Sequence, residues 1–138
     1  MYLKYLSNAE KHLFLELSLH MSNADGCFSD DEKIMIAALC DEMGIPVSYE
    51  TNGTVDDAMD RLAEIHSMRT KKMILFELGG VIMSDGVFDK KEEMMLCNLS
   101  EKASVGDSFA HSAVELVREM FLTYRKIGEL VGAGRECL

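Results

Sequence analysis

The stretch ADGCFSDDEK, residues 24–33, has a near copy in SDGVFDKKEE, residues 84–93. In each copy Gly follows Asp, Phe lies two residues beyond the Gly, and Glu lies seven residues beyond the Asp. An apolar segment precedes each copy, and residues with helical apolar spacing follow it. The repeat therefore predicts two helix–loop–helix units, each with an acidic Asp-Gly turn in its middle.

The composition favours a single helical domain. A chain of 138 residues is long enough for one domain with its own core, and 48% hydrophobic residues argue against disorder. A single Pro and ten Gly leave few of the turn signals that a fold of many strands requires. We expect one all-α domain over residues 1–138, with about six helices.

Helical apolar spacing predicts where those helices lie and how they are related. The expected ranges are residues 3–21, 29–44, 54–66, 68–83, 89–103 and 107–131. The repeated units are residues 3–44 and 68–104, and we expect them to pack around a pseudo-twofold axis. Leu15-Glu16-Leu17 in the first unit resembles Phe76-Glu77-Leu78 in the second.

Three details of packing are expected from the same spacing. The second helix is predicted to face the core with Ile34, Ala37, Ala38, Leu39 and Met43. Gly79-Gly80 lies inside a helical pattern, which favours a close helix–helix contact or a bend there. The last helix has a continuous apolar stripe, which favours a place in the core, with a partner interface as the alternative.

Charge and hydropathy limit the classes of partner. A net charge of −10 argues against a nucleic-acid surface, which needs clustered Lys and Arg. No stretch approaches the ~18 uncharged apolar residues of a transmembrane helix. Cys40 and Cys97 fit apolar helical patterns as small core residues, which favours a reducing, cytoplasmic compartment. The partners that remain are metal ions, other proteins or a second copy of the chain.

The first interpretation of the acidic repeat is that each copy caps a helix. Ser29 with Glu32, and Asp89 with Glu92, have the spacing of a capping box. In that motif the cap side chain accepts a hydrogen bond from a backbone amide, and the glutamate accepts one from the cap residue. This interpretation explains the Ser, the Asp and both glutamates without a ligand.

The second interpretation is a calcium-binding EF-hand loop. Aligning Gly26 and Gly86 with the Gly of that loop places Glu32 and Glu92 at its last ligand position. The first ligand position is then Met21 in one copy and Val81 in the other. A self-contained calcium loop is therefore not expected, because calcium needs six to eight oxygen ligands.

The third interpretation is one cation shared by the two copies. Oxygen ligands favour calcium, magnesium or manganese over zinc. Carboxylates brought this close would repel each other unless a cation neutralised them. The expected ligands are Asp25, Glu32, Asp85 and Glu92, with Asp89 and Ser29 as weaker candidates.

The duplicated motif resembles the TerB family, which is named for tellurite resistance. The resemblance rests on Ala24-Asp25-Gly26 followed by Ser29 and Glu32, and on the second copy at residues 84–92, where Ser84 replaces an Ala common in the family. It implies an all-helical domain of two related halves, acidic residues that bind metal, and a role in a stress response. Asp25, Glu32, Asp85 and Glu92 match the family motif.

The leading functional prediction is a non-catalytic module that binds a metal or another protein. The alternative is a structural adaptor whose acidic turns are helix caps, and a metal-dependent hydrolase comes third. The four histidines are scattered, with no Glu-x-x-His, so no catalytic residue is predicted. Glu16 and Glu77 are interpreted as solvated helix-surface residues.

Overall fold

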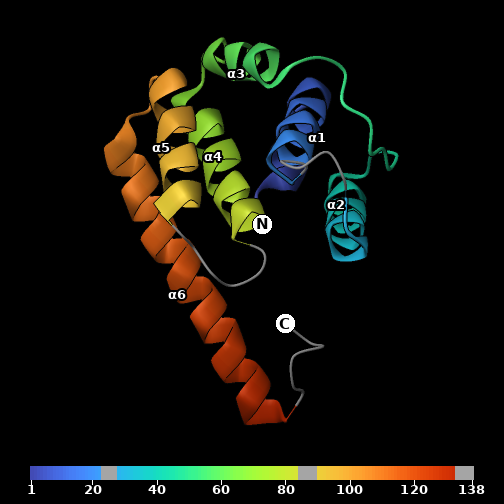
Figure 1. Ribbon diagram of the computed structural model, residues 1–138, viewed down its shortest axis with the longest axis vertical. Helices are drawn as coiled ribbons and strands as arrows, with labels where there is room; N and C mark the ends of the chain where they lie inside the picture. Colours follow the sequence, from blue (N-terminus) through green and yellow to red (C-terminus); the bar gives the residue numbers. More distant parts are fainter. Residues whose placement is uncertain (23–27, 84–89, 133–138) are drawn as a thin grey trace.

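The computed structural model describes residues 1–22, 28–83 and 90–132, and every regular element in these ranges is a helix (Figure 1). A 3-10 turn, η1, precedes six α-helices, which confirms the predicted all-α domain. The elements are η1 (Leu3–Tyr5), α1 (Asn8–Ser22), α2 (Asp30–Met43), α3 (Val55–Ala63), α4 (Met68–Ile82), α5 (Lys90–Lys102) and α6 (Asp107–Val131). Among the described residues, no helix combines the length and the apolar character needed to cross a membrane.

The prediction of one continuous first helix is wrong, because the chain breaks between η1 and α1. Leu6 is extended, with φ −76° and ψ 149°. Ser7 then starts α1: its Oγ accepts a hydrogen bond from the Glu10 amide at 3.2 Å, and Glu10 Oε1 accepts one from the Ser7 amide at 2.8 Å. These reciprocal bonds are a capping box. The signal Ser7-x-x-Glu10 is in the sequence and marks the true start of α1.

The contacts between elements follow a pseudo-twofold arrangement. α1 packs against α4, and each of them packs against the next helix of its own half, α2 or α5. η1 contacts α4 and α2, while α3 contacts α1 and α5. Exchanging α1 with α4, α2 with α5 and η1 with α3 therefore maps the α1–α4 contact onto itself and each of the other contacts onto another of them. This agrees with the two related halves that the repeat predicts, whereas α6 has no counterpart.

Glu16 and Glu77 hold the two halves together, so the prediction that they are solvated is wrong. Glu16, which is 5% exposed, accepts hydrogen bonds from the Asn52 amide at both carboxylate oxygens, at 2.9 and 3.1 Å. Glu77 Oε1 accepts a hydrogen bond from the Tyr2 amide at 2.7 Å. Asn52 lies just before α3 and Tyr2 just before η1. Each glutamate thus binds the backbone ahead of the pseudo-equivalent element.

The buried face of α2 differs from the predicted one. Ile34 is 68% exposed and Ala38 is also exposed, whereas Ile36, Cys40 and Met43 are buried. α2 packs only against α1 and η1 among the stronger contacts, so its buried stripe is narrow. Cys40 is a core residue as expected, and Cys97 on α5 is only half-buried.

Gly79 lies where α4, α5 and α6 meet. A methyl group added there would lie 3.5 Å from Leu96 Cδ2 and 3.6 Å from Val117 Cγ2, which is ordinary van der Waals contact. The expected close approach of helices is therefore confirmed at Gly79. A methyl group on Gly80 would have no neighbour within 4 Å, so Gly80 takes no part in that contact.

The first half of α6 belongs to the core, and the second half extends past the other helices (Figure 1). Ala110, Ala113, Val114 and Val117 are buried. A helix of 25 residues is about 37 Å long, whereas α4, with 15 residues, spans about 22 Å. The prediction that the whole stripe of α6 is core is wrong for its second half, because none of the other helices in the described residues reaches that far (Figure 1).

The buried hydrogen bonds of Glu16 predict a large stability effect. Glu16→Ala should lower the free energy of unfolding by about 1.5–3 kcal/mol, the usual value for hydrogen bonds to a charged group. Urea unfolding monitored by circular dichroism measures this change. Glu115→Ala, at an exposed position of α6, should change stability by less than ~0.5 kcal/mol. Equal effects of the two substitutions would show that the Glu16 contacts do not stabilise the fold.

Candidate functional site

The predicted metal ligands are only partly within the described residues. Asp25, Asp85 and Asp89 lie outside them. Glu32 is in the first turn of α2 and Glu92 in the first turn of α5, and both are half-buried. The convergence of the four carboxylates on one cation therefore stays a prediction.

The first copy of the repeat contains the predicted capping box. Ser29 Oγ accepts a hydrogen bond from the Glu32 amide at 3.1 Å, and Glu32 Oε1 accepts one from the Ser29 amide at 3.0 Å. Thr54 and Asp57 start α3 with the same pair of bonds. Because this capping device recurs, Ser29 and Glu32 need no metal to explain them. The corresponding box of Asp89 and Glu92 stays a prediction.

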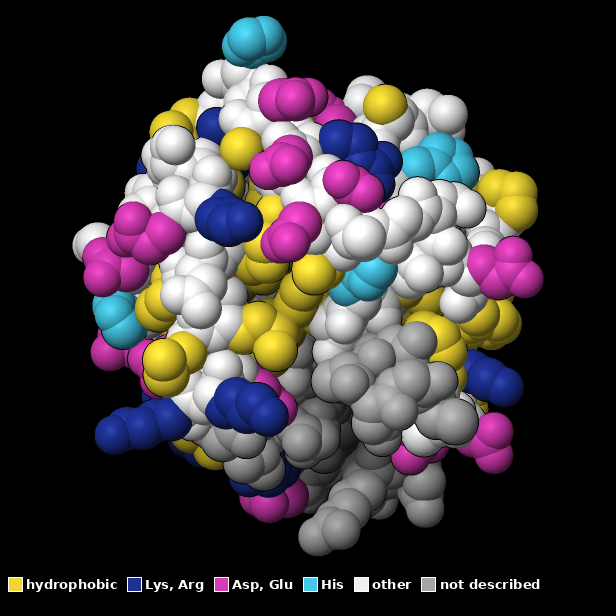
Figure 2. Space-filling model, turned by 45° about the horizontal axis from the view of Figure 1, so that its top comes forward, with side chains coloured by type: hydrophobic (Ala, Val, Ile, Leu, Met, Phe, Trp, Pro, Cys, Tyr) yellow, Lys and Arg dark blue, Asp and Glu magenta, His cyan; other side chains and the backbone are white. Residues whose placement is uncertain are grey.

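No group of three or more His, Cys, Asp or Glu side chains in the described parts of the chain is placed to hold a metal ion. His20 Nε2 lies 3.1 Å from Glu16 Oε1, so this histidine supports the Glu16 contacts. The acidic side chains of the face in Figure 2 gather toward the end where α3 lies, with Lys and Arg scattered among them. That distribution is not typical of a nucleic-acid-binding surface.

Three side chains between α5 and α6 come close to a catalytic arrangement. His111 Nδ1 lies 3.1 Å from Glu93 Oε1, and His111 Nε2 lies 4.0 Å from Cys97 Sγ. Burial raises the pKa of the Cys97 thiol, and the neighbouring carboxylates of Glu93, Asp107 and Glu101 raise it further. The thiolate is the nucleophilic form of cysteine. This environment therefore disfavours a reactive Cys97.

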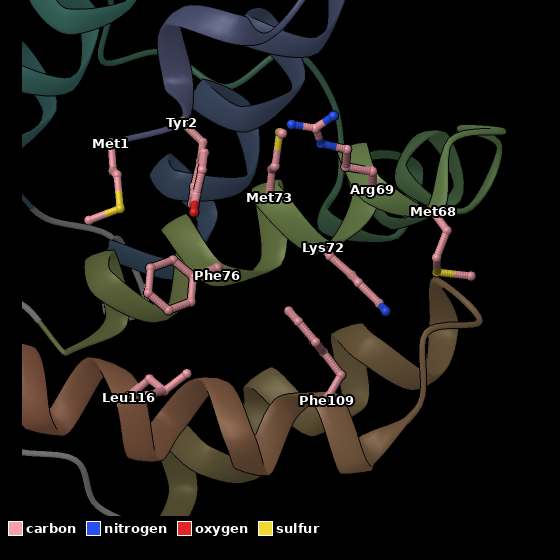
Figure 3. Close-up of a pocket in the computed structure, with 9 residues that line it drawn as sticks. All are labelled: Met1, Tyr2, Met68, Arg69, Lys72, Met73, Phe76, Phe109 and Leu116. Atoms are coloured by element: carbon pink, nitrogen blue, oxygen red, sulfur yellow. The ribbon is translucent and has the colours of Figure 1, made fainter.

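The described residues form a groove between the N-terminal segment, α4 and α6 (Figure 3). Its volume is about 620 Å³. Most of its lining side chains are apolar, and α4 adds two basic ones, Arg69 and Lys72. The lining residues are Met1, Tyr2, Met68, Arg69, Lys72, Met73, Phe76, Phe109 and Leu116. The amino-acid sequence alone does not reveal this groove, because its walls come from three segments that are far apart in the chain.

Aromatic side chains build opposite walls of the groove. The rings of Tyr2 and Phe76 meet edge to face, with centroids 6.4 Å apart and an interplanar angle of 76°. On the α6 side, the Lys72 Nζ lies 5.8 Å from the centroid of the Phe109 ring. Figure 3 shows Lys72 reaching from α4 toward this ring. Arg69 and Lys72 are both exposed, so their positive charges are available at the groove.

The N-terminal wall of the groove is held by an ion-pair cluster. The Met1 ammonium lies 2.9 Å from Glu42 Oε1 and 3.1 Å from Glu77 Oε1. Partial burial disfavours the charged ammonium, but its hydrogen bonds to Glu42 and Glu77 outweigh burial and raise its pKa above 8.0. The positions of Met1 and Tyr2 therefore depend on two carboxylates, one on α2 and one on α4.

The raised pKa predicts how this cluster contributes to stability at different pH values. The folded state holds the ammonium proton more tightly than the unfolded state, so the contribution is complete below pH 8.0 and is lost as pH rises through the higher folded pKa. Nα-acetylation removes the charge. The acetylated protein should melt at a lower temperature near neutral pH and like the free protein at strongly alkaline pH. A constant difference in melting temperature across this range would contradict the prediction.

Comparison with known proteins returned no match. No family model matches the chain, and no curated protein or solved structure is significantly similar to it. The TerB resemblance therefore rests on the duplicated acidic motif alone and stays a prediction.

Proposed function

We propose that this chain is a non-catalytic interaction module of the cytoplasm that binds another protein in the groove between the N-terminal segment, α4 and α6. The observation that supports this proposal is the groove itself. Its volume of about 620 Å³ lies in the range of roughly 300–1,000 Å³ that is typical of binding pockets. Free thiols at Cys40 and Cys97 support a reducing compartment.

The walls of the groove favour an apolar helix as the bound element. Met1, Met68 and Met73 contribute flexible, polarisable side chains, and Met-rich surfaces adapt to the apolar faces of helices. Phe76 and Phe109 add rigid apolar area. A partner helix would insert a few apolar anchor side chains, as in other helix-in-groove complexes.

The charges of the groove favour acidic residues beside those anchors. The whole chain has a net charge of −10, so its long-range field attracts basic partners. Arg69 and Lys72 reverse that sign locally at the groove. The partner segment is therefore an amphipathic helix with an apolar face and flanking Glu or Asp.

Two synthetic peptides with the same leucine spacing test this preference, one flanked by Glu and the other by Lys. We expect the Glu peptide to bind more tightly and to shift the amide NMR signals of Lys72, Phe76 and Phe109. Lys72→Glu should weaken its binding about tenfold, a loss of ~1.4 kcal/mol. The matched control is Lys33→Glu on α2, which makes the same charge change away from the groove and should leave binding unchanged.

Two results would overturn the groove as the binding site. One is tighter binding of the Lys peptide, since net charge alone would then decide affinity. The other is equal weakening by Lys72→Glu and Lys33→Glu. Circular dichroism of both variants confirms that the comparison is made between folded proteins.

We also propose a divalent cation at the acidic turns, with Asp25, Glu32, Asp85 and Glu92 as ligands. The reciprocal packing of the two halves supports it, because Glu32 and Glu92 occupy equivalent first turns of α2 and α5 and are both half-buried. Oxygen ligands favour calcium, magnesium or manganese over zinc. By the TerB resemblance, this site would belong to a stress response such as tellurite resistance.

Thermal melting after exhaustive chelation tests the cation site, with calcium, magnesium, manganese and zinc then added back separately. An ion at 100 times its dissociation constant should stabilise the fold by about 2.7 kcal/mol. Asp25→Asn/Asp85→Asn should abolish that response. Thr54→Ala is the control: it should cost about 1 kcal/mol through loss of the cap of α3 and keep the response to the ion. No response to any ion would leave the acidic turns as helix caps.

A further inference from the structure

From Leu116 to its end, α6 exposes a stripe of large apolar side chains. Leu130 is 85% exposed and Val131 is 67% exposed, and Leu116, Tyr124 and Ile127 are about half exposed. Leu116, Met120, Ile127 and Val131 are spaced by four, seven and four residues, so they share one face of the helix. Figure 1 shows that this part of α6 extends past α4 and α5. A contiguous apolar face on a projecting helix is typical of a protein–protein interface.

The stripe continues a wall of the groove. Phe109 and Leu116 line the groove and are seven residues apart, so they lie on the face of α6 that Met120 and Ile127 extend. The neighbouring face of α6, with Ala113 and Val117, is buried against the bundle. Beside Leu116, a further helix can therefore approach only from the side of the groove.

We propose that this stripe, Leu116 to Val131, binds the same stripe of a second copy in antiparallel orientation. The proposal does not depend on the function proposed for the groove. Its support is the order of charges along one edge of the stripe, where Glu119 and Lys126 are exposed and seven residues apart. Antiparallel pairing about a twofold axis near residues 121 and 122 places each copy's Glu119 opposite the partner's Lys126. The two ion pairs form together because the interface is symmetric.

The same axis also matches the apolar residues. It places Leu116 opposite the partner's Ile127 and Met120 opposite the partner's Thr123. Each such pair forms one layer of an antiparallel helix pair. A parallel pair would place Glu119 near the partner's Tyr124 and would leave both charges without a complement. The charge order therefore selects the antiparallel arrangement.

The net charge of the chain opposes this association, which limits its strength. Each copy carries a charge of −10. At physiological ionic strength, charges are screened beyond about 8 Å, so the repulsion between the bulk of the two copies is reduced while the contacts along α6 persist. We expect a dissociation constant in the micromolar range.

Analytical ultracentrifugation over a wide concentration range at physiological salt tests the dimer. The wild-type protein should sediment as a monomer–dimer equilibrium. Ile127→Glu should weaken dimerisation at least tenfold, because it places a charge in the apolar stripe. Leu122→Glu is the matched control: Leu122 is 47% exposed on the opposite face of α6, so this variant should dimerise like the wild type. Neither Leu122 nor Ile127 lines the groove.

A charge exchange tests the orientation. Glu119→Lys and Lys126→Glu should each weaken the dimer by placing like charges opposite each other, and the double variant should restore it. Circular dichroism verifies that all variants are folded. The proposal is overturned if the wild-type protein stays monomeric at every concentration, or if Leu122→Glu disrupts the dimer as much as Ile127→Glu. It is also overturned if the double variant does not recover association.

Discussion

The buried carboxylate of Glu16 and its counterpart Glu77 are the contacts on which the arrangement of the two halves depends. Each accepts the backbone N–H of a residue that precedes an element of the other half. Removing the carboxylate would leave an amide without its partner and would release the connection that it holds. The two contacts therefore affect the arrangement of the elements as well as stability. Glu77 ties the start of η1 to α4, and Glu16 ties the segment before α3 to α1.

The groove is a consequence of the Glu77 contact. Phe76 and Glu77 are neighbours on α4, so one turn of this helix both binds the Tyr2 amide and packs an aromatic ring against the Tyr2 ring. The Met1 ammonium reaches the same carboxylate and Glu42 on α2. A wall made of the N-terminal segment is thus held by charge on one side and by ring contact on the other. This explains how Met1 and Tyr2, the two residues before η1, form one side of a binding site.

The helices were predictable where their signals are local. Ser29 with Glu32, Thr54 with Asp57, and Gly44 at the end of α2 mark helix ends in the sequence as they do in the structure. The break before α1 was also marked, by Ser7 with Glu10. The burial of Glu16 and the groove had no such signal, because each depends on segments brought together only by the fold. Ile34 was misplaced since spacing shows that a helix has an apolar face but not how much of it the neighbours cover.

α6 shows the same limit in its clearest form. Its apolar residues keep one helical spacing along the whole length, although Val117 is buried and Leu130 is 85% exposed. Periodicity therefore cannot separate core from interface on this helix. Length separates them, because α4 and α5 end while α6 continues. An acidic chain that carries a long apolar stripe beyond its own core exposes a surface prone to association. Glu119 and Lys126 at the edge of that stripe then determine which orientation of a second copy fits it.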